Sequence, residues 1–182
     1  VNYQLKGANE DWGQGVDETR WRSVVKELIG LLSRRNRVAL LCHNVAERRL
    51  AEDLIREIGE THTILMPQTM AEYAQAAARI KVGVVSRIHA AVGLAAIGVP
   101  SVVVGTDTRL VTAEQIGLKT HYVGDAGAAL LHDEAMDLLS RADSERERLL
   151  SVRTQALREY ARLIAEHAQS DDLRSSSGTR SA

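Results

Sequence analysis

The chain has 182 residues, of which 45% are hydrophobic, enough for the core of one domain. Its formal net charge is -1, so neither a nucleic acid nor an acidic membrane surface is expected as a partner. The only cysteine, Cys42, excludes an intrachain disulfide and is typical of a reducing compartment. No apolar run reaches the roughly 18 residues of a membrane span, and no signal-peptide pattern is present, so we expect a cytoplasmic protein.

Aromatic residues make up only 3% of the chain, and phenylalanine is absent. The core must therefore consist of Ala, Val, Leu and Ile, which are typical of parallel sheets covered by helices on both faces. This composition favours the α/β class.

The predicted elements alternate between strands and helices along the chain. Residues 1–5 have the pattern of a strand end whose beginning lies earlier in the polypeptide. Short apolar runs predict further strands at 38–42, 63–66, 81–86, 101–104 and 121–123. Helical spacing predicts helices at 17–34, 47–58, 69–80, 88–97, 111–116, 128–139 and 144–167. This order predicts a three-layer, Rossmann-like parallel sheet flanked by helices.

Several residue types mark the predicted helix ends. Three predicted helices are followed by a glycine that can take the left-handed conformation: Gly59, Gly98 and Gly117. Thr69 with Glu72, and Ser144 with Glu147, have the spacing of capping boxes that begin helices. The polar stretch 169–182 cannot bury enough apolar surface to fold, so we expect a single domain over 1–168 and a disordered tail.

Arg87 and His89 lie at the turn from a predicted strand to a predicted helix, within VGVVSRIHAAVGLAAIGVPSVVVGTDTR at residues 82–109. Free backbone N–H groups and the helix dipole favour an anion there, and histidine ordinarily exchanges protons near neutral pH. This pair is therefore a candidate site for anion binding and proton transfer. A capping histidine beside a surface arginine is the structural alternative.

A second group of polar residues follows the next predicted strand. It comprises Gly105, Thr106, Asp107 and Arg109. Arg109 can bind a carboxylate or phosphate through two hydrogen bonds, and Gly105 permits close approach of a ligand to the backbone. The alternative is a local surface pair between Asp107 and Arg109, of little energetic value.

His43 and Asn44 follow a third predicted strand and are further candidates for lining the same crevice. A lone histidine at such a place is more often a structural hydrogen-bonding group. The cysteine and the histidines lack zinc-site spacing, and Gly13 and Gly15 lack the third glycine of a dinucleotide fingerprint. We expect neither a metal nor a cofactor.

The segment SRIHAAVGLAAIGVPSVVVGTDTR, followed by AEQIGL, resembles the carboxyl-terminal signature of the polysaccharide pyruvyl transferase family. The shared features are an Arg-x-His at a strand end, a helix of small residues, Gly-x-Pro, an apolar strand and an Asp-x-basic step. The resemblance extends over about residues 38–118.

The resemblance implies a fold of two Rossmann-like halves similar to GT-B glycosyltransferases. It implies transfer of pyruvate from phosphoenolpyruvate to a sugar or glycan as a ketal, as in exopolysaccharide biosynthesis. His89 matches the family's acid/base histidine, Arg87 its neighbouring arginine, and Arg109 a substrate-binding basic residue that is often lysine. Because 182 residues leave room only for the carboxyl-terminal half, we expect an amino-terminal half or a homo-oligomer partner to face the site. We expect little transferase activity from these residues alone.

Two other functional classes remain open from the sequence. One is the donor-binding half of a GT-B nucleotide-sugar glycosyltransferase or epimerase, which uses the same crevice for a nucleotide diphosphate. The other is a non-catalytic binding or assembly domain that pairs through an exposed apolar face.

Overall fold

The computed structural model describes residues 1–4, 17–106 and 108–177, with side chains to residue 167. The helices are α1 (Glu18–Ser33), α2 (Val45–Ile58), α3 (Met70–Ala77), α4 (Ile88–Ala96), α5 (Leu110–Gln115), α6 (Ala128–Ser140) and α7 (Ala142–Ser177). The strands are β1 (Ala39–Leu41), β2 (Thr63–Leu65), β3 (Gly83–Val85), β4 (Ser101–Gly105) and β5 (Lys119–Tyr122). The predicted α/β class is confirmed.

The strands form two small parallel sheets. One contains β1 and β2, and the other has the order β3, β4, β5. In the larger sheet Val85 is opposite Val103, and Gly105 is opposite Tyr122. Because every pair is parallel, all carboxyl ends of the strands lie along the same edge.

The first two residues of the chain connect these sheets. The Val1 amino group donates to the Ala39 carbonyl (2.7 Å), and the Leu41 N–H donates to the Val1 carbonyl (2.8 Å). On the other side, the Asn2 N–H donates to the Val84 carbonyl (2.8 Å), and the Ser86 N–H donates to the Asn2 carbonyl (3.1 Å). The order across the molecule is therefore β2, β1, residues 1–2, β3, β4, β5.

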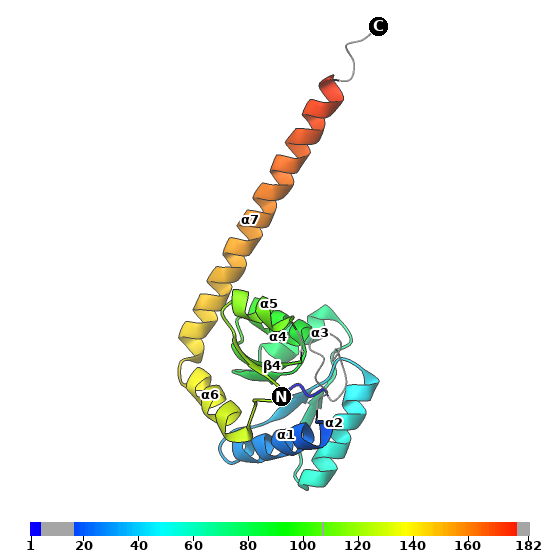
Figure 1. The fold of residues 1–182 in the computed structure, drawn as a ribbon, viewed down its shortest axis with the longest axis vertical. Helices are drawn as coiled ribbons and strands as arrows, with labels where there is room; N and C mark the ends of the chain where they lie inside the picture. The colour runs from blue at the N-terminus through cyan, green and yellow to red at the C-terminus, as the bar shows by residue number, and fades with distance from the viewer. Residues whose placement is uncertain (5–16, 107, 178–182) are drawn as a thin grey trace.

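Helices cover both faces of this arrangement (Figure 1). Side chains of successive strand residues point to opposite faces of the sheet, so neighbouring valines lie in different hydrophobic cores. Val84 and Val102 pack with α1, α2 and α6, whereas Val85 and Val103 pack with α3, α4, α5 and the first part of α7. The outcome is three layers: helices, parallel strands and helices.

Most predicted helix ends are confirmed. Gly59, Gly98 and Gly117 have φ values of 75°, 84° and 76°, in the left-handed region. The Thr69 hydroxyl accepts the Glu72 N–H (3.2 Å), and the Glu72 carboxylate accepts the Gln68 N–H (2.7 Å). The first bond is the N-cap bond of the predicted capping box, and in the second the Glu72 carboxylate reaches the residue before the N-cap.

The last helix differs from its prediction at both ends. It begins at Ala142, and the Ser144 hydroxyl donates to the Arg141 carbonyl (2.9 Å), so the predicted capping box at Ser144 is wrong. It continues to Ser177, ten residues past the predicted end at His167. Figure 1 shows its carboxyl-terminal part projecting from the layered body. The disordered tail expected at residues 169–182 stays a prediction.

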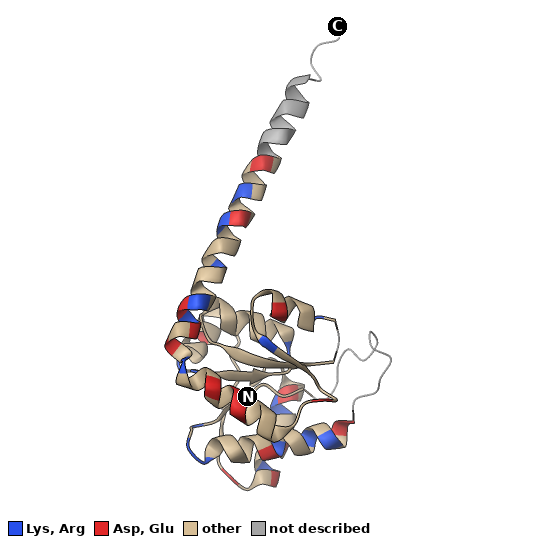
Figure 2. Ribbon diagram, turned by 60° about the vertical axis from the view of Figure 1, so that its left-hand side comes forward, with Lys and Arg blue, Asp and Glu red and all other residues tan. Residues whose placement is uncertain are grey.

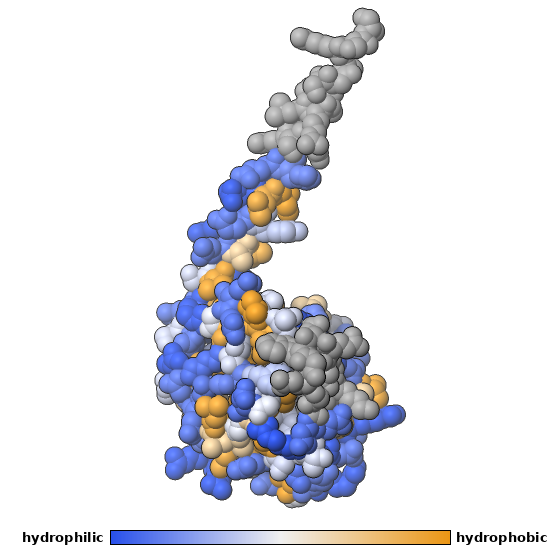
Figure 3. All heavy atoms as spheres, viewed as in Figure 1, coloured by the Kyte–Doolittle hydropathy of each residue, from blue (hydrophilic) through white to orange (hydrophobic). Residues whose placement is uncertain are grey.

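The projecting part of α7 has exposed apolar side chains at Leu157, Tyr160, Leu163 and Ile164. Apolar atoms along this part are visible in Figure 3, and charged residues alternate with them (Figure 2). Within the described ranges, neither α7 nor any other helix combines the length and apolar character needed to cross a membrane.

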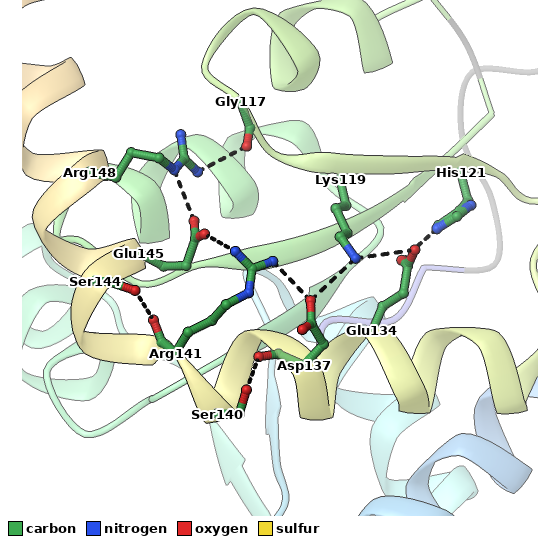
Figure 4. A network of polar contacts seen from close by, with 10 residues as sticks. All are labelled: Gly117, Lys119, His121, Glu134, Asp137, Ser140, Arg141, Ser144, Glu145 and Arg148. Carbon is green, nitrogen blue, oxygen red and sulfur yellow. Dashed lines mark hydrogen bonds and ion pairs between the residues drawn. The ribbon is translucent and has the colours of Figure 1, made fainter.

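Charged side chains join the base of α7 to α6, β5 and the end of α5 (Figure 4). Arg141 bonds to Asp137 (2.9 Å) and Glu145 (2.6 Å), and Arg148 bonds to Glu145 (2.9 Å) and to the Gly117 carbonyl (2.9 Å). We call the whole network the α6–α7 charge ladder; its members are Lys119, His121, Glu134, Asp137, Arg141, Glu145 and Arg148.

Candidate functional site

The candidate site lies at the carboxyl ends of β1 and β3, on either side of the amino-terminal segment. The chain leaves β1 into the turn at His43 and Asn44, and it leaves β3 into the turn at Ser86 and Arg87. Ligands of open parallel sheets bind at this edge. The structure therefore brings together side chains from two of the three strand ends that the sequence singles out.

A buried carboxylate, Glu47, is at the centre of this group. Only 3% of Glu47 is exposed. Its Oε2 accepts the His43 backbone N–H (2.9 Å) and the Asn2 amide (3.3 Å), and its Oε1 accepts the Asn44 amide (3.2 Å). Oε1 also pairs with Nε of Arg87. We call these five residues the Glu47 cluster.

The position of Glu47 follows from the start of α2. Asn44 is the N-cap of this helix, and its side-chain oxygen accepts the Glu47 N–H (2.9 Å). A carboxylate in the first turn is favoured by the helix dipole. Burial acts to raise the pKa of Glu47, but hydrogen bonds from His43 and the charge of Arg87 together hold this pKa below its ordinary value. Glu47 is therefore an anion at neutral pH and holds the Arg87 guanidinium in place.

Asn2 connects the segments that meet at this edge. It is 2% exposed, its amide donates to the Leu41 carbonyl (2.9 Å), and its side-chain oxygen accepts the Arg87 N–H (3.1 Å). One side chain thus connects the end of β1, the carboxylate of Glu47 and the backbone of Arg87, the N-cap of α4.

Arg87 and His89 lie at the start of α4. Arg87 is the N-cap, its side chain is 30% exposed, and Glu47 is its only acidic partner among the described residues. His89, in the first turn of α4, is exposed. A partly exposed cation thus lies at the amino end of α4, and an exposed imidazole follows in the first turn. These two residue types suit binding of an anion and transfer of a proton.

Tyr73 of α3 borders the cluster on the side of His43. Its ring centroid lies 6.1 Å from that of His43, and its hydroxyl donates to the Ala90 carbonyl of α4 (3.2 Å). Burial raises the pKa of Tyr73 to about 12. The phenol therefore remains protonated and acts as a fixed hydrogen-bond donor.

The residues after β4 lie at the next strand end and not in the Glu47 cluster. A Cβ on Gly105 would lie 2.7 Å from Cδ2 of Leu110, so this glycine makes room for Leu110, where we expected room for a ligand. Thr106 is half-buried, and Arg109 is exposed and forms the N-cap of α5. Asp107 lies outside the described residues.

Two members of the Glu47 cluster are absent from the residues predicted as site residues. The signal for Glu47 is present in the sequence, because Asn44 and Glu47 have capping-box spacing directly after an apolar run. Asn2 has no comparable signal, since its role depends on strands 39 and 83 residues further along the chain.

Comparison with family models, with curated proteins and with solved structures finds no match to this chain. The function therefore has to be inferred from the residues themselves.

Proposed function

We propose that this chain is the carboxyl-terminal, Rossmann-like half of a cytoplasmic enzyme of the polysaccharide pyruvyl transferase type, and that phosphoenolpyruvate binds at Arg87 and His89. The observation that carries the proposal is the guanidinium of Arg87, held by buried Glu47 at the amino end of α4, two residues before the exposed imidazole of His89. This is the Arg-x-His pair of the resemblance.

The strand order supports the proposal. With residues 1–2 counted as the first strand, the order β2, β1, residues 1–2, β3, β4, β5 corresponds to 3-2-1-4-5-6. In doubly wound sheets of this order, the crevice lies where the chain changes direction across the sheet, between the first and fourth strands. The side chains of Asn2 and Arg87 lie at that point.

The proposed chemistry assigns a task to each group. Arg87 and the backbone N–H groups of α4 hold the phosphate or carboxylate of phosphoenolpyruvate, and His89 donates a proton to its methylene carbon. A sugar hydroxyl then forms a C–O bond to the cationic central carbon. Breaking of the bond to phosphate and attack by a second hydroxyl complete the ketal. One hydroxyl proton returns to His89, and the other leaves with phosphate or solvent.

Arg109 is assigned to binding alone. An arginine keeps its proton at neutral pH, so it can hold a carboxylate or phosphate but cannot exchange a proton where the family often has lysine. Thr106 and Asp107 belong to the same strand end, and His43 and Asn44 to the strand end on the other side. A facing half or partner would supply the rest of the cleft and the acceptor sugar or glycan.

The main alternative is the donor-binding half of a nucleotide-sugar glycosyltransferase or epimerase. The observation that favours it is the same strand order, which dinucleotide-binding sheets share. A non-catalytic assembly domain is a further alternative, favoured by the exposed apolar side chains of α7.

The proposal is tested by titrating the protein with phosphoenolpyruvate while the His89 resonances are followed by NMR. We expect saturable shifts at His89. Arg87→Gln should weaken the affinity about tenfold to hundredfold, the value of a charge-assisted hydrogen bond. Arg49→Gln is the matched control, because Arg49 is exposed on α2 outside the Glu47 cluster and should leave the affinity unchanged.

Uridine diphosphate, titrated in competition, separates the two enzyme classes. We expect uridine diphosphate to displace phosphoenolpyruvate only when it is in high excess. Tight binding of uridine diphosphate with no response to phosphoenolpyruvate would favour the nucleotide-sugar alternative, and no saturable response at His89 to either compound would contradict both.

A further inference from the structure

The imidazole of His43 and the buried carboxylate of Glu47 form a second pair within the Glu47 cluster. Nδ1 of His43 lies 3.4 Å from Oε2 of Glu47. The same oxygen accepts the backbone N–H of His43 at 2.9 Å. The backbone and the ring of one residue therefore converge on one carboxylate oxygen, and this fixes which edge of the imidazole faces the protein interior.

The two nitrogens of this ring differ in their surroundings. Nδ1 is buried and has no completed hydrogen bond among the described residues, so the carboxylate at 3.4 Å is the acceptor in place for it. Hydrogen bonds of catalytic groups are often long before substrate binds and tighten afterwards. The side chain as a whole is 25% exposed, so solvent reaches the part of the ring away from Nδ1, which carries Nε2.

The charge of Glu47 decides which of the two nitrogens carries the proton. The carboxylate is an anion at neutral pH, because hydrogen bonds from His43 and the charge of Arg87 together hold the pKa of Glu47 below its ordinary value. An ionised carboxylate accepts hydrogen bonds and donates none, so His43 in its neutral form keeps its proton on Nδ1. Nε2 then carries a lone pair on the exposed part of the ring. A general base held by a carboxylate has this arrangement.

Tyr73 gives the imidazole a second fixed neighbour. The two rings lie with their centroids 6.1 Å apart and their planes at 41°. The phenol is itself held, because its hydroxyl donates to the Ala90 carbonyl at 3.2 Å. Rotation of the His43 ring would therefore disturb an aromatic contact as well as the contact with Glu47.

The shared carboxylate also brings His43 close to the proposed anion site. Nε of Arg87 pairs with Oε1 of Glu47, and the His43 ring contacts Oε2. The cation that would hold phosphoenolpyruvate and the imidazole of His43 thus contact the two oxygens of one buried side chain. Both lie at the same edge of the strands.

We propose that His43 is the general base for an acceptor hydroxyl and that Glu47 positions it, a role that rests on the proposed function. After the bond to phosphate has broken, the second hydroxyl oxygen forms its C–O bond to the central carbon, and its proton passes to the lone pair on Nε2. His43 then releases this proton to the departed phosphate or to solvent. The proton of the first hydroxyl restores His89, which has protonated the methylene carbon.

The first test is the tautomer of His43 without ligand, which follows from the nitrogen NMR shifts of its ring. We expect neutral His43 to carry its proton on Nδ1. His132 is the matched reference, because its side chain is 28% exposed and its Nδ1 contacts Asp133 at 2.9 Å, but Asp133 is 80% exposed. Water competes for that carboxylate, so we expect a mixture of tautomers at His132. A proton on Nε2 of His43 would overturn the proposal.

The second test asks whether Nε2 of His43 faces bound phosphoenolpyruvate. Diethyl pyrocarbonate modifies accessible imidazole nitrogens that carry a lone pair, and mass spectrometry locates the modified residue. Phosphoenolpyruvate at about ten times its Kd should slow modification of His43 about tenfold, because only the free protein reacts, and should leave His132 unchanged. Equal modification of His43 with and without bound phosphoenolpyruvate would place His43 outside the site and overturn the proposal.

Two variants separate the positioning role of Glu47 from a general effect on stability. Glu47→Gln should move part of the His43 proton from Nδ1 to Nε2, because the amide can donate to Nδ1. Glu52→Gln, on the same helix but paired with Arg48, should leave the tautomer unchanged. An unchanged tautomer in folded Glu47→Gln would contradict the positioning role, and the wild-type tautomer decides the matter if this variant does not fold.

His43→Gln distinguishes failure of this role from failure of the proposed function. The variant removes the base but not the anion site, so the His89 resonances should still respond to phosphoenolpyruvate with a Kd within about twofold of the wild type, since the contacts of Arg87 remain. No response of His89 in the wild type would contradict the proposed function and this role with it. A response of His89 without protection of His43 would contradict this role alone.

Discussion

The Glu47 cluster and the α6–α7 charge ladder both use ion pairs to join helices to strands, but they differ in burial. Glu47 is 3% exposed, whereas the side chains of Asp137 and Arg141 are 48% and 42% exposed. In the cluster one carboxylate has several partners inside the protein. In the ladder Asp137 and Arg141 are also solvated by water, whereas Glu145 is buried and bonds to both Arg141 and Arg148.

This difference decides what each network contributes. A buried carboxylate without its partners costs several kcal/mol, so every donor around Glu47 is required. An exposed ion pair contributes about 0–1 kcal/mol and is weakened by salt, because water already solvates both charges. The Glu47 cluster can therefore fix the Arg87 guanidinium in one position. The α6–α7 charge ladder contributes less to stability and helps to orient α7 against α6.

The largest effect is expected for Glu47→Gln. The substitution places an amide NH₂ among donors from His43, Asn2 and Arg87 and removes the charge that holds the guanidinium. We expect the free energy of unfolding, measured with urea, to fall by about 2–4 kcal/mol.

Glu52→Gln is the matched control for this substitution. Glu52 lies on the same helix and pairs with Arg48 at 2.9 Å, but both side chains are about half exposed. It should leave the free energy of unfolding unchanged within error. If the free energy of unfolding fell equally in the two variants, the buried and the exposed ion pair would contribute equally to stability, contrary to the expected effect of burial.

The same contrast explains how much of the molecule can be predicted from the sequence. Local signals place the helix ends at Gly59 and Gly117 and the N-cap at Thr69, because each depends on residues a few positions apart. They also place Arg87, His43 and Asn44 at strand ends. The contact of Glu47 with Arg87 depends on the spatial order of strands, which no local pattern contains.

The errors at α7 have a related cause. Ser144 and Glu147 have the spacing of a capping box, yet α6 and α7 are separated by Arg141 alone, so the helix has already begun when Ser144 is reached. Arg141 bonds to residues four positions away on both sides, Asp137 and Glu145. These (i, i+4) ion pairs favour helical structure on both sides of Arg141, before Ser144 is reached.

Acidification should lower the free energy of unfolding, because Glu47 loses its charge. Its pKa in the folded protein lies below the ordinary value of 4.5, so the folded state binds this proton less readily than the unfolded state. The stabilisation is fully present above about pH 4.5 and is lost as the pH falls through the folded-state pKa. The stability difference between the wild type and Glu47→Gln should therefore narrow from pH 6 to pH 3, as measured by urea unfolding at each pH.

Glu57 provides the exposed counterpart for this titration. Hydrogen bonds from Arg22 and Lys26 lower the pKa of Glu57 to about 2, but its side chain is 42% exposed. Addition of 0.5 M NaCl should weaken the part of the pH dependence of stability that Glu57 causes. The part that Glu47 causes should stay unchanged, because the buried pair is screened less. A pH profile of the Glu47→Gln variant parallel to that of the wild type would contradict the assigned role of this carboxylate.

The smallest effect on stability is expected for Arg141→Gln in the ladder. Its hydrogen bond to Asp137 is the main cause that holds the pKa of Asp137 below the ordinary value of 3.8. The variant should therefore raise the pKa of Asp137, as followed by NMR of its carboxyl carbon, while Tm stays unchanged within error. Lys119 still lies 3.5 Å from Asp137, and Arg148 still bonds to Glu145, so neither carboxylate loses all its partners. A fall in Tm as large as that of Glu47→Gln would mean that the ladder holds α7 and the sheet together as firmly as the buried cluster holds Arg87.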